Sequence, residues 1–227
     1  MIEPHEPRPS LFPPVIGFLL IANIAVFLLQ LVAFETLLVN FGLWPVGTPD
    51  VIEQDGEFVW VPSFQIWQLL TYGFMHGGLL HLFLNLFAMW MLGVQLENAW
   101  GSRLFAVYFF VCVIGAGLIQ LFVASNGVLG DGIYPTIGAS GGVFGILLAF
   151  GMMFPNQKLI FILLPVPIRA KYFVIAFGAF ELFAGITGTL AGVAHFAHLG
   201  GMLFGFLLIQ YWRGRLPVKP RRRVFWW

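Results

Sequence analysis

Long stretches without charge constrain the fold of this chain more than any other feature. Asp, Glu, Lys and Arg are absent from residues 9–34, 58–96, 104–130, 132–157 and 182–212. An ionised side chain in hydrocarbon costs several kcal/mol unless it is paired or faces water. The 227 residues are 59% hydrophobic and 9% charged, whereas soluble domains are about 25% charged. The pattern predicts an integral membrane protein and excludes an ordinary water-exposed globule.

The lengths of these stretches predict six membrane-spanning helices. A spanning helix needs roughly 20 apolar residues, and the predicted spans cover about residues 14–38, 67–93, 104–124, 138–154, 171–188 and 194–212. We therefore predict an all-α polytopic membrane protein. Its one membrane domain, 14–212, follows a cytoplasmic tail, 1–13, and precedes a basic cytoplasmic tail, 213–227. The proline-containing segment 159–169 is too broken for a seventh span and should turn at the inner interface.

The basic residues predict the orientation of these spans. All 11 Lys and Arg residues fall in segments on one side of the membrane if the spans alternate in direction. The positive-inside bias places these segments and both termini in the cytoplasm of a multi-pass protein of the cell (inner) membrane. The lipid bilayer is thus the first partner. A net charge of +1 gives no indication of nucleic acid, and the single cysteine, Cys112, excludes an internal disulfide.

Several polar side chains lie within or at the ends of the predicted spans, namely His76, His81, Asn85, Ser140, Glu181, His195 and His198. A single such residue often only bonds two helices together. Counted along a helix from the nearest charge on the inner side, Ser140 lies roughly 27 Å away, His198 roughly 22 Å and His81 roughly 24 Å. Three residues from three spans therefore share one layer, in the outer half of a core about 30 Å thick.

Helical phase indicates which of these residues meet. His81 and Asn85 are four residues apart and share one face of a helix. His198 shares a face with two glycines, and four glycines surround Ser140. Glycine-faced helices approach closely in lipid, so these two spans can bring Ser140 and His198 within hydrogen-bond reach. A serine bonded to a histidine is the arrangement of an activated nucleophile.

Three motifs at these positions resemble those of rhomboid intramembrane serine proteases. Residues 138–141, Gly-Ala-Ser-Gly, look like the GxSG motif of that family. Residues 76–85 resemble its second-span His and His-xxx-Asn signature, and residues 197–205 resemble its sixth-span AHxxGxxxG motif. All three occur in order, on the matching spans and at a common depth. The resemblance covers about residues 14–212 and implies a rhomboid-like six-helix bundle.

The resemblance implies a role for each matching residue. Ser140 would be the nucleophile, and His198 would be the general base and later the general acid. His81 and Asn85, with the backbone N–H of Ser140, would bind the oxyanion. With no buried aspartate to complete a triad, we expect a Ser-His dyad whose imidazole is held by packing. Phe144, one turn after the nucleophile where the family often has tyrosine, can pack against His198.

The implied activity is that of an intramembrane serine endopeptidase without metal or cofactor. Its substrates would be single-span membrane proteins, cut near the outer end of the helix beside small residues. The fifth span and the loop 188–192 are the candidate gate. Trp67-Gln68 stands where the family has Trp-Arg, which leaves open how the outer loop is anchored.

Three other functions compete with this one. An inactive rhomboid-like protein could bind membrane proteins in quality control, but such proteins normally lack the nucleophile or the base. A transporter is supported only by broken apolar segments and Glu181. Zinc or haem could bind the histidine pairs, but HExxH is absent and neither pair has the spacing of four that helix ligands typically use.

The polar residues outside the expected dyad are predicted to have structural roles. Glu181 has no motif partner, so we expect it to make a structural hydrogen bond. His76 should anchor a loop. His195 is close to His198 in sequence, but phase and glycine spacing favour His198 as the base. Glu97 and the segment 101–103 resemble the family's inner turn after the second span.

Overall fold

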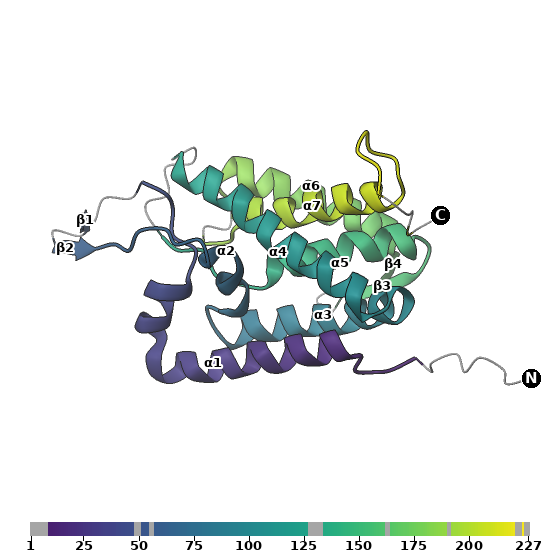
Figure 1. Cartoon of the computed structure of the whole chain (residues 1–227), viewed down its shortest axis with the longest axis horizontal. Coiled ribbons are helices and arrows are strands. Elements are labelled where there is room, and N and C mark those ends of the chain that lie inside the picture. The colour runs from purple at the N-terminus through teal and green to yellow at the C-terminus, as the bar shows by residue number, and fades with distance from the viewer. Residues whose placement is uncertain are drawn as a thin grey trace, which may run out of the picture.

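The chain forms a bundle of α-helices with two short hairpins near opposite ends (Figure 1). The computed structural model describes residues 9–47, 51–54, 57–126, 134–161, 164–189, 192–220 and 224. Its helices are α1 (Pro14–Phe41), α2 (Gln68–Thr71), the 3-10 helix η1 (Tyr72–Phe74), α3 (Leu79–Trp100), α4 (Ser102–Ser125), α5 (Ser140–Met153), α6 (Ala170–Thr187) and α7 (His195–Trp212). The antiparallel hairpins pair β1 (Val51–Gln54) with β2 (Glu57–Trp60), and β3 (Lys158–Phe161) with β4 (Leu164–Arg169). The predicted helical membrane bundle is confirmed, and the hairpins are a minor addition.

The helices match most of the predicted spans. α1, α4, α5, α6 and α7 each begin and end within three residues of a predicted span. Among the described residues, α1, α3, α4 and α6 are long and apolar enough to cross a membrane, whereas α5 is shorter. The molecule is a multi-pass membrane protein, and the count of six spans stays a prediction. The β3–β4 hairpin occupies the proline-containing segment that was expected to turn.

Parts of the predicted tails and of the predicted gate loop lie outside the described residues. Residues 1–8 of the amino-terminal tail and residues 221–223 and 225–227 of the basic tail lie outside the described residues. Residues 190–191 of the predicted gate loop also lie outside them.

The second predicted span, 67–93, has the wrong bounds. A non-helical segment that includes Gly77 and Gly78 separates η1 from α3, and Gly78 has an extended backbone. α3 then continues past residue 93 to Trp100 because Glu97 is not an exposed charge there: it is only 2% exposed. The predicted span therefore starts before α3 starts and ends before α3 ends, although it lies within the charge-free stretch 58–96.

Glu97 joins three helices at the inner end of the bundle, which we define as the end with the α3–α4 turn and the β3–β4 hairpin. Its carboxylate accepts hydrogen bonds from the backbone N–H groups of Val15 at 2.9 Å and Ile16 at 2.8 Å. It also accepts one from the Ser102 hydroxyl at 2.6 Å. The first N–H groups of a helix lack carbonyl partners within the helix, so Glu97 caps α1. The single residue Gly101, with φ +80°, makes the turn into α4.

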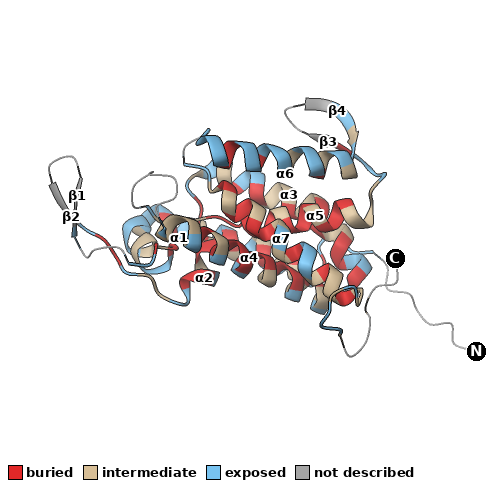
Figure 2. Cartoon of the chain, turned by 90° about the horizontal axis from the view of Figure 1, so that it is seen from above, coloured by how far each residue is buried: buried red, intermediate tan, exposed pale blue. Residues whose placement is uncertain are grey.

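α5 lies at the centre of the bundle. It contacts α3, α4, α6 and α7, and every one of its residues is buried or partly buried. Figure 2 shows α5 largely buried, while one face of α6 is exposed. At 14 residues it is roughly 21 Å long, shorter than the roughly 30 Å hydrocarbon core. Its first residue, Ser140, can therefore lie below the membrane surface, shielded from lipid by its neighbours.

Close contact between α5 and α7 depends on glycine, as the sequence predicts. A Cβ atom on Gly201 of α7 would overlap the carbonyl group of Gly141 of α5. On the α4 side, a Cβ atom on Gly145 would overlap the sulfur of Cys112. The backbones of α5 and α7 are therefore in direct contact, and the Cys112 side chain of α4 packs on the backbone of α5. This contact fixes the first turns of α5 and α7 relative to each other.

Candidate active site

An ordered segment leads the chain to Ser140. The backbones of Leu43 and Thr136 exchange two hydrogen bonds of 3.0 and 2.9 Å, and the Gly138 N–H donates to the carbonyl of Tyr72 at 2.9 Å. Non-helical backbone is tolerated at membrane depth when it is buried in protein or lines a cavity. These bonds hold the segment so that α5 starts at Ser140.

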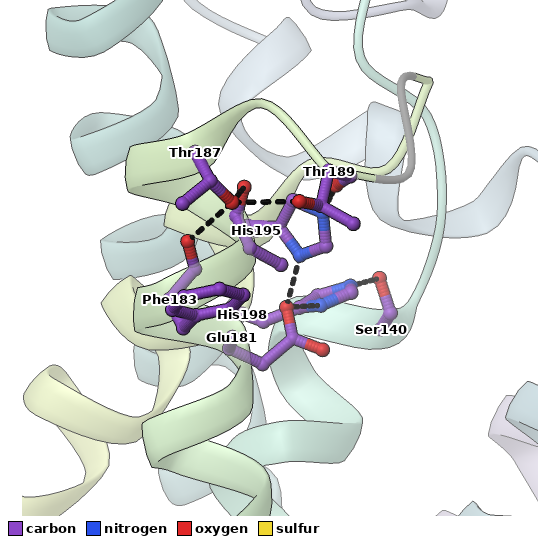
Figure 3. Close-up of polar contacts among 8 residues, drawn as sticks. Ser140, Glu181, Phe183, Thr187, Thr189, His195 and His198 are labelled. Atoms are coloured by element: carbon purple, nitrogen blue, oxygen red, sulfur yellow. Dashed lines mark hydrogen bonds and ion pairs between the residues drawn. The ribbon is translucent and has the colours of Figure 1, made fainter.

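Ser140 and His198 meet between the first turns of α5 and α7 (Figure 3). Ser140 Oγ lies 2.8 Å from His198 Nε2, which is hydrogen-bond distance. His198 is 8% exposed. The Phe144 ring stacks on the imidazole, with centroids 4.2 Å apart and planes at 6°. The predicted packing of Phe144 against His198 is confirmed, and His198 rather than His195 is the histidine beside Ser140.

Packing is not the only support for the His198 ring, so the expectation on this point is wrong. Glu181 Oε2 of α6 lies 2.8 Å from His198 Nδ1. When Ser140 donates to Nε2, the proton of the neutral ring is on Nδ1 and donates to Glu181. Ser140, His198 and Glu181 form the chain hydroxyl–imidazole–carboxylate, which is the order found in serine protease triads.

His195 also binds this carboxylate. Its Nδ1 lies 2.7 Å from Glu181 Oε2, and its Nε2 lies 3.0 Å from the carbonyl oxygen of Thr189. Thr189 follows the end of α6, and its hydroxyl lies 2.7 Å from that of Thr187. Figure 3 shows these groups in one continuous network that ends at Ser140.

His81 faces Ser140 across Gly138. The Gly77 N–H donates to His81 Nδ1 at 3.3 Å, so a neutral His81 ring has its proton on Nε2. A Cβ atom placed on Gly138 would lie 2.9 Å from His81 Nε2 and 3.5 Å from Ser140 Oγ. Gly138 also has φ +133°, a conformation that favours glycine. Glycine therefore leaves a space between the hydroxyl and an imidazole N–H.

Asn85 and the first N–H of α5 border the same region. Asn85 is 5% exposed, and its Nδ2 donates to the carbonyl of His81 at 2.9 Å. An amide nitrogen has two hydrogens, so a second donor remains. The backbone N–H of Ser140, as the first of its helix, has no carbonyl partner within that helix.

These residues open into a cavity of about 640 Å³. Ser140, His198, His81 and Asn85 lie on its wall together with Gly77. The rest of the lining is mainly apolar and comes from α3, α5, α6, β3 and the segments before α5 and α7. The cavity is therefore apolar over most of its wall and polar at one place, beside Ser140.

The side chains of Glu181, His195 and His198 could in principle hold a metal ion. Their three ligand atoms lie within 4.8 Å of one another. Two ligands of one tetrahedral zinc ion are roughly 3.4 Å apart, whereas the carboxylate oxygen is 2.7 and 2.8 Å from the two ring nitrogens. These are the distances of charge-assisted hydrogen bonds.

Two other predicted polar residues, His76 and Gln68, bond to neighbouring segments of the chain and do not line the cavity. His76 exchanges backbone hydrogen bonds with the Gln30 side chain of α1, at 2.9 and 3.0 Å. Gln68 Oε1 accepts from the backbone N–H groups of Trp44 and Gln65, at 3.3 and 3.1 Å. Gln68 thus anchors the outer loop where the family has arginine.

Sequence reasoning missed Glu181 as a partner of His198, although a signal existed. An ionisable residue within an apolar span is by default a candidate for function. His195 and His198 are three residues apart, so they share a face on which one carboxylate can meet both. The crossing of α6 over α7 decides whether it does, and the sequence pattern does not supply that.

Comparison with known proteins agrees with these observations. A family model for the Rhomboid domain matches residues 63–215. The chain is 30% identical over 154 residues to Rhomboid protein 1, mitochondrial, of Saccharomyces cerevisiae, covering 66% of this chain and 43% of that protein. It is 32% identical over 158 residues to the human Presenilin-associated rhomboid-like protein, mitochondrial, covering 66% and 40%. For RHOMBOID-like protein 4 of Arabidopsis thaliana the values are 29% over 143 residues, 63% and 33%.

The chain spans at most about two fifths of the length of these relatives. The matched region nevertheless holds Ser140, His198, Glu181, His81 and Asn85. With the family model covering most of the chain, the helical membrane bundle and its serine–histidine pair belong to a member of the rhomboid family.

Proposed function

We propose that the chain is an intramembrane serine endopeptidase. The observation that carries this proposal is the 2.8 Å contact between Ser140 Oγ and His198 Nε2 on the wall of an apolar cavity. Soluble proteins also contain buried serine–histidine contacts, but this pair has three candidate oxyanion donors around it. A nucleophile, a base and an anion site in one place are the parts that acyl transfer requires.

The first chemical step is attack by Ser140 Oγ on the carbonyl carbon of the scissile peptide. His198 Nε2 accepts the hydroxyl proton and becomes an imidazolium, stabilised by the carboxylate of Glu181. The proton then passes from Nε2 to the leaving amine, and the peptide C–N bond breaks. Water, activated by His198 in the same way, hydrolyses the ester on Ser140 and restores the enzyme.

Negative charge on the carbonyl oxygen is stabilised in the space beside Gly138. The donors are His81 Nε2–H, the free hydrogen of Asn85 Nδ2 and the Ser140 N–H. One preorganised donor in a water-poor site contributes roughly 3–4 kcal/mol to the transition state. The start of α5 adds the positive end of a helix dipole.

The substrates are single-span membrane proteins cut near the outer end of the helix. The cavity walls are apolar, which suits a segment that arrives from lipid. We place the protein in the cell membrane with both termini cytoplasmic, on the distribution of its basic residues. Two of the relatives bear the word mitochondrial in their names, so fractionation of cells that produce a tagged chain tests the compartment.

The test of activity is cleavage of a transmembrane reporter by the detergent-purified protein. Ser140→Ala and His198→Ala should each abolish cleavage while the proteins retain the thermal stability of the wild type. Undiminished cleavage by either variant would overturn the mechanism. A wild type that binds the reporter without cleaving it would favour an inactive membrane-protein binder.

A further inference from the structure

We propose that Glu181 and His195 are positioning residues for His198 and act as one unit that shares a proton. This inference rests on the proposed function and assigns residues beyond the serine and histidine. The shared carboxylate oxygen fixes the orientation and tautomer of His198. Because His195 shares a proton with that oxygen, the oxygen has no second proton to donate to His198. His195 also bonds to the Thr189 carbonyl, just after the end of α6.

Hydrogen-bond donors and acceptors determine how many protons the pair holds. The Thr189 carbonyl can only accept, so the His195 nitrogen 3.0 Å away, Nε2, has a hydrogen. The other nitrogen, Nδ1, is 2.7 Å from Glu181 Oε2, and that contact also needs a hydrogen between the two atoms. Whether it is bonded to nitrogen or to oxygen, Glu181 and His195 together have no net charge.

A neutral pair suits this location. Glu181 is 4% exposed and His195 is 5% exposed, and both lie in or beside an apolar helix. An isolated carboxylate there would be costly and would tend to bind a proton. Its protonated oxygen would donate to His198 Nδ1, leaving the His198 proton on Nε2, where it could not accept from Ser140. His195 prevents this because its own hydrogen already satisfies the carboxylate.

The unit also joins two helices at the site. Glu181 belongs to α6, whereas His195 and His198 belong to α7. The Thr189 carbonyl lies beyond the α6 end, Gly188, and closes a ring of contacts from α6 to the first turn of α7 and back (Figure 3). The position of α6 therefore controls whether His198 is held in its productive orientation.

Three variants and one control separate this role from simple packing. Glu181→Gln keeps the shape but removes the carboxyl group that shares the proton, and its kcat should fall by about 10²- to 10⁴-fold with little change in KM. His195→Gln places its amide near Nε2 and loses the contact to Glu181, so kcat should fall by about 10- to 100-fold. His195→Asn places its amide near Nδ1, restores a donor to Glu181 and should recover most of that loss.

Glu97→Gln is the matched control. It alters a second buried glutamate, which lies at the inner end of the bundle, away from the cavity. A second measurement is the rate at which a fluorophosphonate reacts with Ser140. In Glu97→Gln this rate, per folded molecule, should stay within about threefold of wild type. The same labelling rate should fall in Glu181→Gln and in His195→Gln, because labelling needs the activated serine but no substrate binding.

The outcomes distinguish failure of this inference from failure of the proposed function. Wild-type labelling rates in both Glu181→Gln and His195→Gln would overturn the inference and leave the serine–histidine mechanism standing. If the wild type does not react at all, the proposed function fails. In that case ¹⁵N NMR of His198 still tests the unit: a protonated Nδ1 that becomes unprotonated in His195→Gln supports it, and an unchanged ring overturns it.

Discussion

Two buried glutamates, Glu97 and Glu181, have the same chemistry but different neighbours. Glu97 is 2% exposed and Glu181 is 4% exposed. The first accepts from backbone N–H groups of α1 and from the Ser102 hydroxyl, at the inner end of the bundle. The second meets two imidazoles in the cavity region. Backbone N–H groups cannot take up protons near neutral pH, whereas imidazoles can. The groups that bond to each carboxylate therefore determine its role: Glu97 stabilises the fold, and we assign Glu181 to catalysis.

The largest expected effect distinguishes two serines. Ser140 contacts His198, which is bonded to Glu181, and Ser102 donates to Glu97. Ser140→Ala removes the nucleophile and should lower cleavage of a transmembrane reporter by at least about 10³-fold. Ser102→Ala removes the hydroxyl bonded to Glu97 and should lower the free energy of unfolding by about 1–2 kcal/mol without changing kcat. Equal losses of cleavage in the two variants would contradict the assignment of Glu97 to the fold and Glu181 to catalysis.

A substitution of His81 tests whether the space beside Gly138 binds an oxyanion. His81→Leu replaces the imidazole by an apolar side chain and removes the Nε2–H beside Gly138. We expect kcat to fall by about 10²- to 10³-fold with KM nearly constant, because the donor acts on the developing oxyanion. Steady-state kinetics with the reporter measure this, and a change confined to KM would assign His81 to substrate binding.

Gly201 tests how strictly the site depends on helix approach. A Cβ atom there would overlap the Gly141 carbonyl, so Gly201→Ala should separate α5 from α7 and lower kcat by about 10²-fold. Gly17 of α1 has no atom within 4 Å of its Cβ position. Gly17→Ala should keep full activity and raise stability slightly. Full activity of Gly201→Ala would show that the Ser140–His198 contact tolerates a wider spacing.

Glu97 itself should affect stability rather than catalysis. Glu97→Gln weakens the cap on α1 and the bond to Ser102, and the free energy of unfolding should fall by about 1–3 kcal/mol. Denaturant unfolding of the purified protein in detergent measures the loss. Cleavage per folded molecule should be unchanged, and a large fall in kcat would mean that the two ends are coupled.

Phe144 should give the smallest effect. Phe144→Leu removes the ring that stacks on His198, whose orientation is also held by Glu181. Aromatic pairs contribute about 0.5–1.5 kcal/mol beyond burial, so we expect kcat to fall by roughly 2- to 10-fold. A loss as large as that of Glu181→Gln would mean that packing holds the imidazole after all.

Charge distribution and helical period predicted much of this structure. Five predicted spans match single helices, because a lipid-facing segment must be apolar along its length. The proximity of Ser140 and His198 followed from glycine faces and common depth. Both inferences use only short-range sequence patterns and the thickness of the membrane.

Two of the errors share one physical origin. Glu97 follows a charge-free stretch but lies inside α3, and Glu181, for which the sequence predicts only a structural hydrogen bond, contacts His198. Each carboxylate is accommodated by donors from another part of the chain, 81 residues away for the Ile16–Glu97 bond and 17 for His198–Glu181. Such partners depend on how helices cross, which a pattern along one helix does not contain.

The most direct measurement is the reaction of the purified protein with a fluorophosphonate, followed by mass spectrometry of its peptides. A single adduct on Ser140, formed at a rate that falls to background in His198→Ala, is the predicted result. An absence of adduct on the wild type, or an adduct on Ser140 that forms equally fast in His198→Ala, would contradict the serine–histidine mechanism.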